Sequence, residues 1–157
     1  MGGRLASKKS TSGGKAQASA SRGLFLTQGE VVAVRRTLEG VMTLASHGIL
    51  YRIGQQLGER VVAQAKANGG NLEDACGKAL VESGWAKQVQ FFPAKVQVMG
   101  SLEVEAGTIE PTCHLLRGVL HRVLNESRGA VAVRETECTS AGASACVFEA
   151  QKGGRSP

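Results

Sequence analysis

The order in which two hydrophobic periodicities follow each other constrains the fold of this chain most strongly. Over residues 30–66 and again after Asn71, apolar residues recur every three to four positions, which is typical of amphipathic helices. Over residues 89–104 they alternate with polar residues, which is typical of strands. A further helical stripe and a short hairpin pattern follow. Because no βαβ unit repeats, we expect an α+β fold in which N-terminal helices pack on an antiparallel sheet, with a C-terminal helix and β-hairpin.

Three helices are expected in the N-terminal half, over residues 30–44, over residues 47–66, and from Asn71 as N-cap to a stop at Gly84. Their apolar sides are expected to hold Val31, Val34, Leu38, Val41 and Met42 in the first helix, Leu50, Ile53, Gly54, Leu57, Gly58, Val61 and Ala65 in the second, and Leu72, Ala75, Cys76, Ala79 and Leu80 in the third.

Gly54 and Gly58 lie one turn apart in the second helix, where each glycine costs about 1 kcal/mol relative to alanine. That cost indicates that something needs the space. Close packing against another helix is one interpretation, and clearance for a ligand is the other.

The C-terminal half is expected to contain strands around Val89–Phe91, Val96–Val98 and Leu102–Val104. Pro111 suits the start of a helix that ends near Asn125. The last expected elements are two hairpin strands, 131–133 and 146–148, joined through a turn at residues 140–142.

Positive charge is concentrated outside the expected core. The net charge is +6, but the first 22 residues hold five basic residues and no acidic one, whereas residues 23–151 hold 12 basic and 13 acidic residues. Nucleic-acid binding through counterion release needs a clustered basic face. We therefore do not expect the core to bind nucleic acid. We expect one domain, 23–151, between disordered tails at 1–22 and 152–157, and the basic tail could still bind a partner.

No apolar run approaches the roughly 20 residues that span a bilayer, and the N-terminal stretch lacks the apolar segment of a secretion signal. We therefore expect a cytoplasmic protein. In that reducing compartment, the four cysteines are expected to be thiols or metal ligands rather than disulfides.

Cys113, Cys138 and Cys146 open the last helix and flank the hairpin turn, so they can converge. A structural zinc site needs four donors, which leaves one to be found among Glu135, Glu137 and His114; Glu135 is the preferred candidate. Regular strand alternation would place Glu135 and Cys138 on opposite faces, so the two can share a metal only if the strand bends. The alternative is three buried thiols packed as small hydrophobic groups.

The segments Cys113–Gly118, Glu135–Cys138 and Gly142–Glu149 resemble the signature of the 4-vinyl reductase (vinyl-four-reductase) domain family. Upstream, Leu50–Gly54 with Gly58 is similar to the central helix of that family, so the resemblance extends over residues 30–149. Ala143 departs from the family pattern, which often has Asp after the glycine.

The resemblance implies a fold shared with TRAPP vesicle-tethering subunits and with sensor domains of aromatic-responsive bacterial activators. In those sensors a Cys, a Glu three residues before a second Cys, and a third Cys eight residues later hold zinc. Carried over, this pattern implies Cys113, Glu135, Cys138 and Cys146 as ligands of a structural zinc ion.

The family also implies a pocket between sheet and helices for a hydrophobic, aromatic or tetrapyrrole ligand. The ligand-binding residues expected here are Tyr51, Trp85, Phe92 and Met99. Tyr51 and Trp85 are the only residues of their types, and ordinary core packing is the alternative for both.

No G-x-G-x-x-G motif follows a strand, and none of His47, His114 and His121 is paired with a nucleophile by its sequence context, so no catalytic residue is expected. The expected function is a sensor or carrier for a small hydrophobic molecule, which forms a homodimer through an exposed apolar helix face. One alternative is a tetrapyrrole vinyl reductase or accessory factor in (bacterio)chlorophyll synthesis. The other is a TRAPP-like adaptor that binds a protein partner.

Overall fold

The computed structural model describes residues 26–153, and the tail expected at 1–22 lies outside them, as do the last four residues of the tail expected at 152–157. The elements are α1 (Gln28–Met42), α2 (Ala45–Asn68), α3 (Leu72–Glu82), β1 (Gln88–Phe91), β2 (Lys95–Met99), α4 (His114–Arg128), β3 (Val131–Glu137), the short 3-10 helix η1 (Thr139–Ala141) and β4 (Cys146–Lys152). The expected α+β class is confirmed. In residues 26–153, no helix combines the length and the apolar character needed to cross a bilayer.

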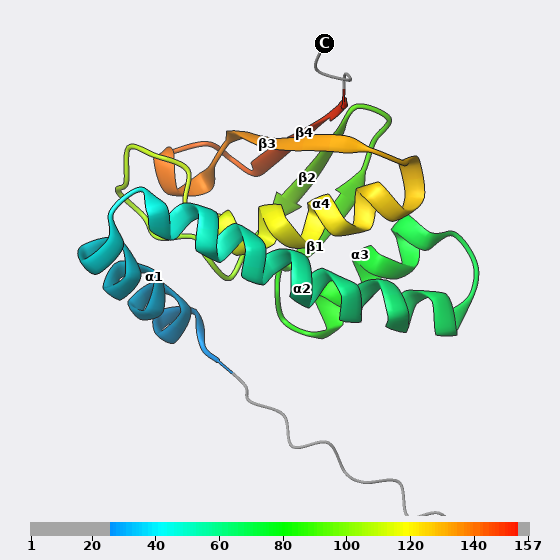
Figure 1. Ribbon diagram of the computed structural model, residues 1–157, viewed down its shortest axis with the longest axis horizontal. Coiled ribbons are helices and arrows are strands. Elements are labelled where there is room, and N and C mark those ends of the chain that lie inside the picture. Colours follow the sequence, from blue (N-terminus) through cyan, green and yellow to red (C-terminus); the bar gives the residue numbers. More distant parts are fainter. Residues whose placement is uncertain (1–25, 154–157) are drawn as a thin grey trace, which may run out of the picture.

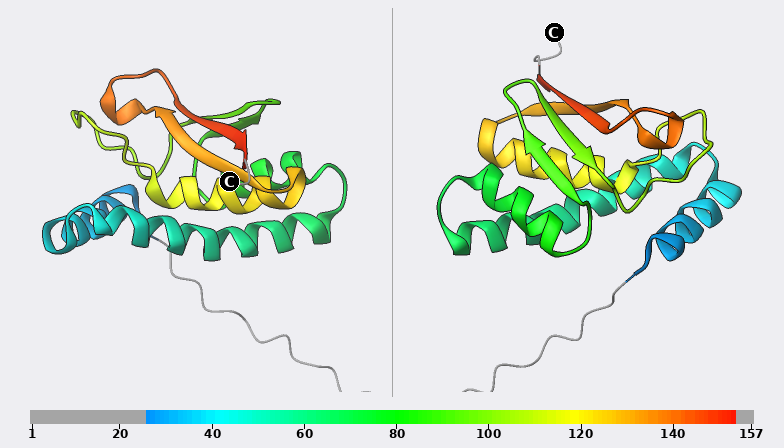
Figure 2. Two further views of the ribbon diagram at one scale, coloured as in Figure 1. Left: turned by 45° about the horizontal axis from the view of Figure 1, so that its top comes forward. Right: turned by 180° about the vertical axis from the view of Figure 1, so that it is seen from behind.

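The four strands form one antiparallel sheet in the order β1-β2-β4-β3. α4 lies against one face of this sheet, and α2 runs along the far side of α4, so α4 is the middle layer (Figure 2). α3 packs beside them near β1, and α1 extends from one end of α2 (Figure 1). The loop that enters α4 and the turn of the β3–β4 hairpin meet at the same end of the molecule.

The core fills the space between the sheet and α4. Its largest fully buried side chains are Phe148, Val96 and Val98 from the sheet, Leu116, Val119, Leu120, Val123 and Leu124 from α4, Leu50 from α2, and Leu80 and Cys76 from α3. Cys76 is therefore ordinary core, as expected.

α2 and α4 cross with backbone against backbone. A Cβ atom on Gly54 would overlap the carbonyl oxygen of Leu115, and one on Gly118 would overlap the carbonyl oxygen of Tyr51. One turn further along α2, a Cβ atom on Gly58 would lie 2.8 Å from the Cβ atom of Arg122. The glycine pair therefore serves close helix packing, and the interpretation as ligand clearance is wrong.

The expected buried face of α1 is confirmed for Val31 but is wrong in most of its other members. Val34, Val41 and Met42 are 48%, 80% and 39% exposed, and Ile53 in α2 is 43% exposed. Besides Val31, α1 buries Arg35, because the Arg35 guanidinium pairs with Glu39 in the same helix and with Glu105 in the loop before α4.

Leu102 and Val104 do not form the expected strand, because the chain is irregular between β2 and α4. The turn at Ser101 places the side chain of Glu103 at the start of α4, where its carboxylate accepts the backbone N–H groups of Leu115 (2.9 Å) and Leu116 (2.6 Å). Glu103 is 1% exposed and thus satisfies two free helix donors in place of a side-chain cap. Burial raises the pKa of Glu103 to about 7.

Arg128 ties three elements together near the far end of α4. Its Nε and Nη2 atoms donate to the two carboxylate oxygens of Glu73 in α3, at 2.6 and 2.7 Å, and its Nη1 donates to the carbonyl oxygen of Pro93 between β1 and β2, at 2.8 Å. The Arg128 guanidinium beside Glu73 lowers the pKa of that carboxyl.

We predict that Gly118→Ala lowers the free energy of unfolding by about 3 kcal/mol or more, because the added methyl group meets rigid backbone of α2. Gly48→Ala is the matched control within α2, since nothing lies within 4 Å of a Cβ atom there, and it should raise stability by about 0.5–1 kcal/mol. Urea unfolding followed by circular dichroism measures both. Equal effects of the two substitutions would contradict the close crossing.

We predict that Glu73→Gln costs about 1 kcal/mol of stability at pH 7. Because the pKa of Glu73 is lower in the folded than in the unfolded protein, its contribution is present above the ordinary pKa of a glutamate. It is lost as the pH falls through the lower folded value. The difference between wild type and variant in urea unfolding should therefore shrink between pH 5 and about pH 3.

Glu82→Gln is the control for this ion pair, since Glu82 meets Lys78 only at 3.8 Å and both side chains are largely exposed. It should leave stability unchanged at every pH. A Glu73→Gln effect that does not depend on pH would show that the pair does not contribute through its charge.

Candidate metal centre

Three thiols meet where α4 begins and the β3–β4 hairpin turns. Cys113 is the residue before α4, Cys138 follows the last residue of β3, and Cys146 is the first residue of β4. The Sγ atom of Cys146 lies 3.6 Å from that of Cys113 and 3.9 Å from that of Cys138. All three are at most 2% exposed.

A β-bulge brings Glu135 to the same place. Glu135 is paired with Phe148 in β4, and Glu137 is paired with the next residue, Val147, so Thr136 is an extra residue in β3. The bulge resolves the conflict with strand alternation, because it turns Glu135 and Cys138 toward the same side. Glu135 is 7% exposed.

The ligand atoms of Cys113, Glu135, Cys138 and Cys146, here called the thiol cluster, all lie within 4.8 Å of one another. Of the other candidates for the fourth donor, Glu137 is exposed and His114 belongs to a different group.

The donors of the thiol cluster fit a metal ion. One oxygen of Glu135, Oε2, accepts the backbone N–H of Cys113 at 3.2 Å, whereas the other, Oε1, is buried without a hydrogen-bond partner. A buried polar atom without a partner is costly and calls for an explanation. Three sulfur donors and one carboxylate oxygen form a tetrahedral set that suits Zn²⁺.

The four acidic groups shift one another's pKa values in opposite directions. Burial, followed by hydrogen bonding with Cys138, raises the pKa of Glu135 to about 8. Hydrogen bonds with Cys138 and Cys146 raise the pKa of the Cys113 thiol, and hydrogen bonds from Cys113 and Cys146 lower that of Cys138. A divalent cation among them would favour the charged form of each donor.

Buried hydroxyl groups surround the thiols, and no motif in the sequence pointed to them. Thr112 Oγ1 lies 3.8 Å from Cys138 Sγ and 2.6 Å from Ser140 Oγ, and Ser101 Oγ accepts from Cys113 Sγ at 3.5 Å. These three residues are each 2% exposed. They orient the sulfur atoms in the way that outer partners orient metal ligands.

The four residues expected to bind a ligand do not share one place. Tyr51 faces α4, with its ring 4.9 Å from the Arg117 guanidinium carbon and 5.5 Å from the His121 ring. Trp85 is half-buried and packs against the core. Met99 lies at one end of the β1–β2 pair and Phe92 beyond the other end, since Gln88 is paired with Met99 and Phe91 with Val96.

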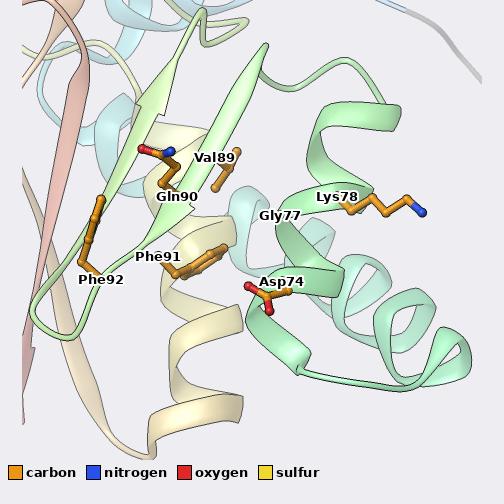
Figure 3. A pocket seen from close by; sticks show the side chains of 7 residues that line it. All are labelled: Asp74, Gly77, Lys78, Val89, Gln90, Phe91 and Phe92. Carbon is orange, nitrogen blue, oxygen red and sulfur yellow. The ribbon is translucent and has the colours of Figure 1, made fainter.

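Phe92 alone of these four lines the cavity between α3 and β1 (Figure 3). This cavity measures about 340 Å³ and is lined by Asp74, Gly77, Lys78, Val89, Gln90, Phe91 and Phe92. In the close view, Val89 and Phe91 project toward α3 from one face of β1, whereas Gln90 projects from the other.

Residues 95–152 match the family model of the V4R domain. The match runs from β2 to the end of β4 and includes the whole thiol cluster, so the resemblance to the 4-vinyl reductase domain is confirmed. No curated protein matches the sequence.

The solved structures that share the fold include the following two. The phenol-responsive sensory domain of the transcription activator PoxR, crystallised with phenol, is 17% identical over 84% of this chain and 77% of its own, with a TM-score of 0.69. A vinyl-4-reductase family protein from Methanocaldococcus jannaschii is 18% identical over 80% of this chain and 92% of its own, with a TM-score of 0.53. The arrangement of helices and sheet is therefore that of the V4R and PoxR sensor fold.

Proposed function

We propose that this chain is a small-molecule-binding sensor or carrier domain in which Cys113, Glu135, Cys138 and Cys146 hold a structural zinc ion. The observation that carries the zinc site is the convergence of three buried thiols with a carboxylate oxygen that has no other partner. The V4R match and the likeness to a phenol-responsive sensory domain support the ligand-binding role.

The proposed zinc ion acts on stability rather than on chemistry. Four protein donors complete a tetrahedral shell, so no coordination position is left for a reacting water molecule. The ion would cross-link the start of α4 to both ends of the η1 turn. Folding and metal binding are then coupled, because the unfolded chain has no preformed site.

The cavity between α3 and β1 is the proposed ligand site (Figure 3). The space between the sheet and α4 is filled by core side chains such as Phe148 and Leu120, whereas this cavity is open. Phe91 and Phe92 offer aromatic surface, and Asp74 and Lys78 can hydrogen-bond a polar group of the ligand. A small aromatic molecule such as phenol matches this lining.

A homodimer is part of the proposal. Val41 in α1, Leu44 in the turn after it and Ile109 in the loop before α4 are 80%, 76% and 95% exposed. Exposed apolar residues gathered near one end of the molecule favour burial against a second copy.

We predict about one zinc ion per chain in purified protein and its loss in Cys138→Ala. The variant should also melt at a lower temperature, because the thiol cluster then lacks the ion that links α4 to the hairpin. Elemental analysis combined with thermal melts, with and without a chelator, provides both measurements.

Cys76→Ala is the matched control, since Cys76 is equally buried but lies in α3 outside the thiol cluster. It should lose some stability through its small cavity and retain the zinc ion. If wild-type protein is metal-free and a chelator does not change its melting temperature, the three cysteines are core residues and not metal ligands.

We predict that phenol shifts the backbone NMR signals of residues 89–92 and that Phe92→Ala weakens its binding about threefold to tenfold. Met99→Ala is the control, because Met99 is 39% exposed, close to the 38% of Phe92, but lies at the opposite end of the β1–β2 pair. Equal weakening by both substitutions, or no shift at residues 89–92, would place the ligand elsewhere.

A further inference from the structure

A second group of metal-binding side chains lies where α1, α2 and α4 meet. Glu39 of α1, His47 of α2 and His114 of α4, here called the histidine group, have ligand atoms within 4.8 Å of one another. His47 Nε2 is 3.3 Å from Glu39 Oε1. From the sequence, His114 was considered as a donor to the thiol cluster and as a general acid or base, and nothing connected it with Glu39 and His47 as metal ligands.

A plain ion pair beside a buried core histidine does not account for this arrangement. His114 is 7% exposed, and it lines a cavity together with His47 instead of being enclosed by core side chains on every side. By contrast, both ring nitrogens of His121 are hydrogen-bonded within the protein, since they lie 2.8 Å from Gln55 Nε2 and 2.8 Å from Asn125 Nδ2.

The histidine group stands between two cavities. His47 lines a cavity of about 540 Å³ with Glu39 and the loop before α4, and also a cavity of about 250 Å³ that is lined by His114. Glu110 lines both and adds a further carboxylate. A metal ion at this place would have room for water or for an external ligand.

We propose that Glu39, His47 and His114 form a second metal site that binds a divalent transition metal ion. Two imidazole nitrogens and one carboxylate oxygen suit Zn²⁺, Co²⁺ or Ni²⁺. Three protein donors leave a coordination position open, unlike the four donors of the thiol cluster. This site is thus the one in the described part of the chain where a bound metal could meet a small anionic or neutral ligand.

Arg35 holds the carboxylate in place. Its Nη1 atom donates to both oxygens of Glu39, at 3.0 and 2.9 Å, which is the role that outer partners have for metal-binding carboxylates. Its positive charge also repels a cation, so the histidine group binds metal more weakly than the thiol cluster does. The two sites therefore fill one after the other and can be separated by titration.

One imidazole ring must turn on metal binding. The rings of His47 and His114 stack with centroids 3.9 Å apart and planes at 20°, whereas nitrogen lone pairs lie in the ring plane and must converge on the ion. The side chain of His47 is 25% exposed, so its ring is the one free to turn about the Cβ–Cγ bond. Binding should change the environment of both rings.

The test uses untagged, zinc-loaded, full-length protein titrated with Co²⁺. We expect a second equivalent of metal that brings no sulfur-to-metal absorption band, because its donors are nitrogen and oxygen. With Zn²⁺ as the diamagnetic probe, NMR signals of the His47 and His114 rings should shift, while those of His121, the third histidine of the chain, stay in place.

Two substitutions locate the second equivalent. His47→Gln and Glu39→Gln should each weaken Co²⁺ binding by at least about tenfold, since each removes one of three ligands. Glu82→Gln, on the exposed side of α3, should leave binding unchanged. Thermal melts show whether each variant remains folded, and the ring shifts in wild-type protein need no variant at all.

The proposal is overturned if wild-type protein takes up no second equivalent, if both variants bind it as well as wild type does, or if it brings a sulfur absorption band. The last result would mean that Co²⁺ had replaced the ion in the thiol cluster. The outcome does not depend on the proposed sensor function, because the histidine group shares no donor with the thiol cluster.

Discussion

Where α2 crosses α4, two backbones touch without side chains between them, and this contact determines the positions of most other parts of the structure. α4 is the middle layer, so its distance from α2 sets how the sheet lies over both helices. His114 is the first residue of α4 and Cys113 precedes it. The crossing at Gly54 and Gly118 therefore helps to position both the thiol cluster and the histidine group, which each take one residue from the start of this helix.

Local patterns were enough for the elements that depend on local energetics. Alternation predicted β1 and β2, and Asn71 was correctly assigned as an N-cap, since its side chain accepts the backbone N–H groups of Glu73 and Asp74. The buried face of α1 could not be predicted in this way. Arg35 is buried because Glu105, 70 residues later, is there to receive it, and no periodicity within α1 contains that information.

The predicted metal ligands and the predicted ligand-binding residues also differed in how much the sequence could say about them. Spacing and family resemblance together singled out four residues that the structure does bring together, because three of them flank one hairpin turn and the fourth precedes the helix packed under it. The expected ligand residues rested on a pocket that the resemblance implied, and no spacing in the sequence shows whether the fold brings such residues to one place. The hydroxyl groups of Ser101, Thr112 and Ser140 were missed because serine and threonine are common in loops of every kind.

The extra residue Thr136 has a consequence for how such sites can be recognised and moved between proteins. A glutamate and a cysteine three positions apart point to one side only because the strand carries a bulge between them. A regular hairpin with the same letters would send the carboxylate to the opposite face of its sheet. A motif search that scores letters alone therefore accepts hairpins that cannot coordinate a metal, and a protein engineer who grafts this centre must transfer the irregular backbone along with the four donors.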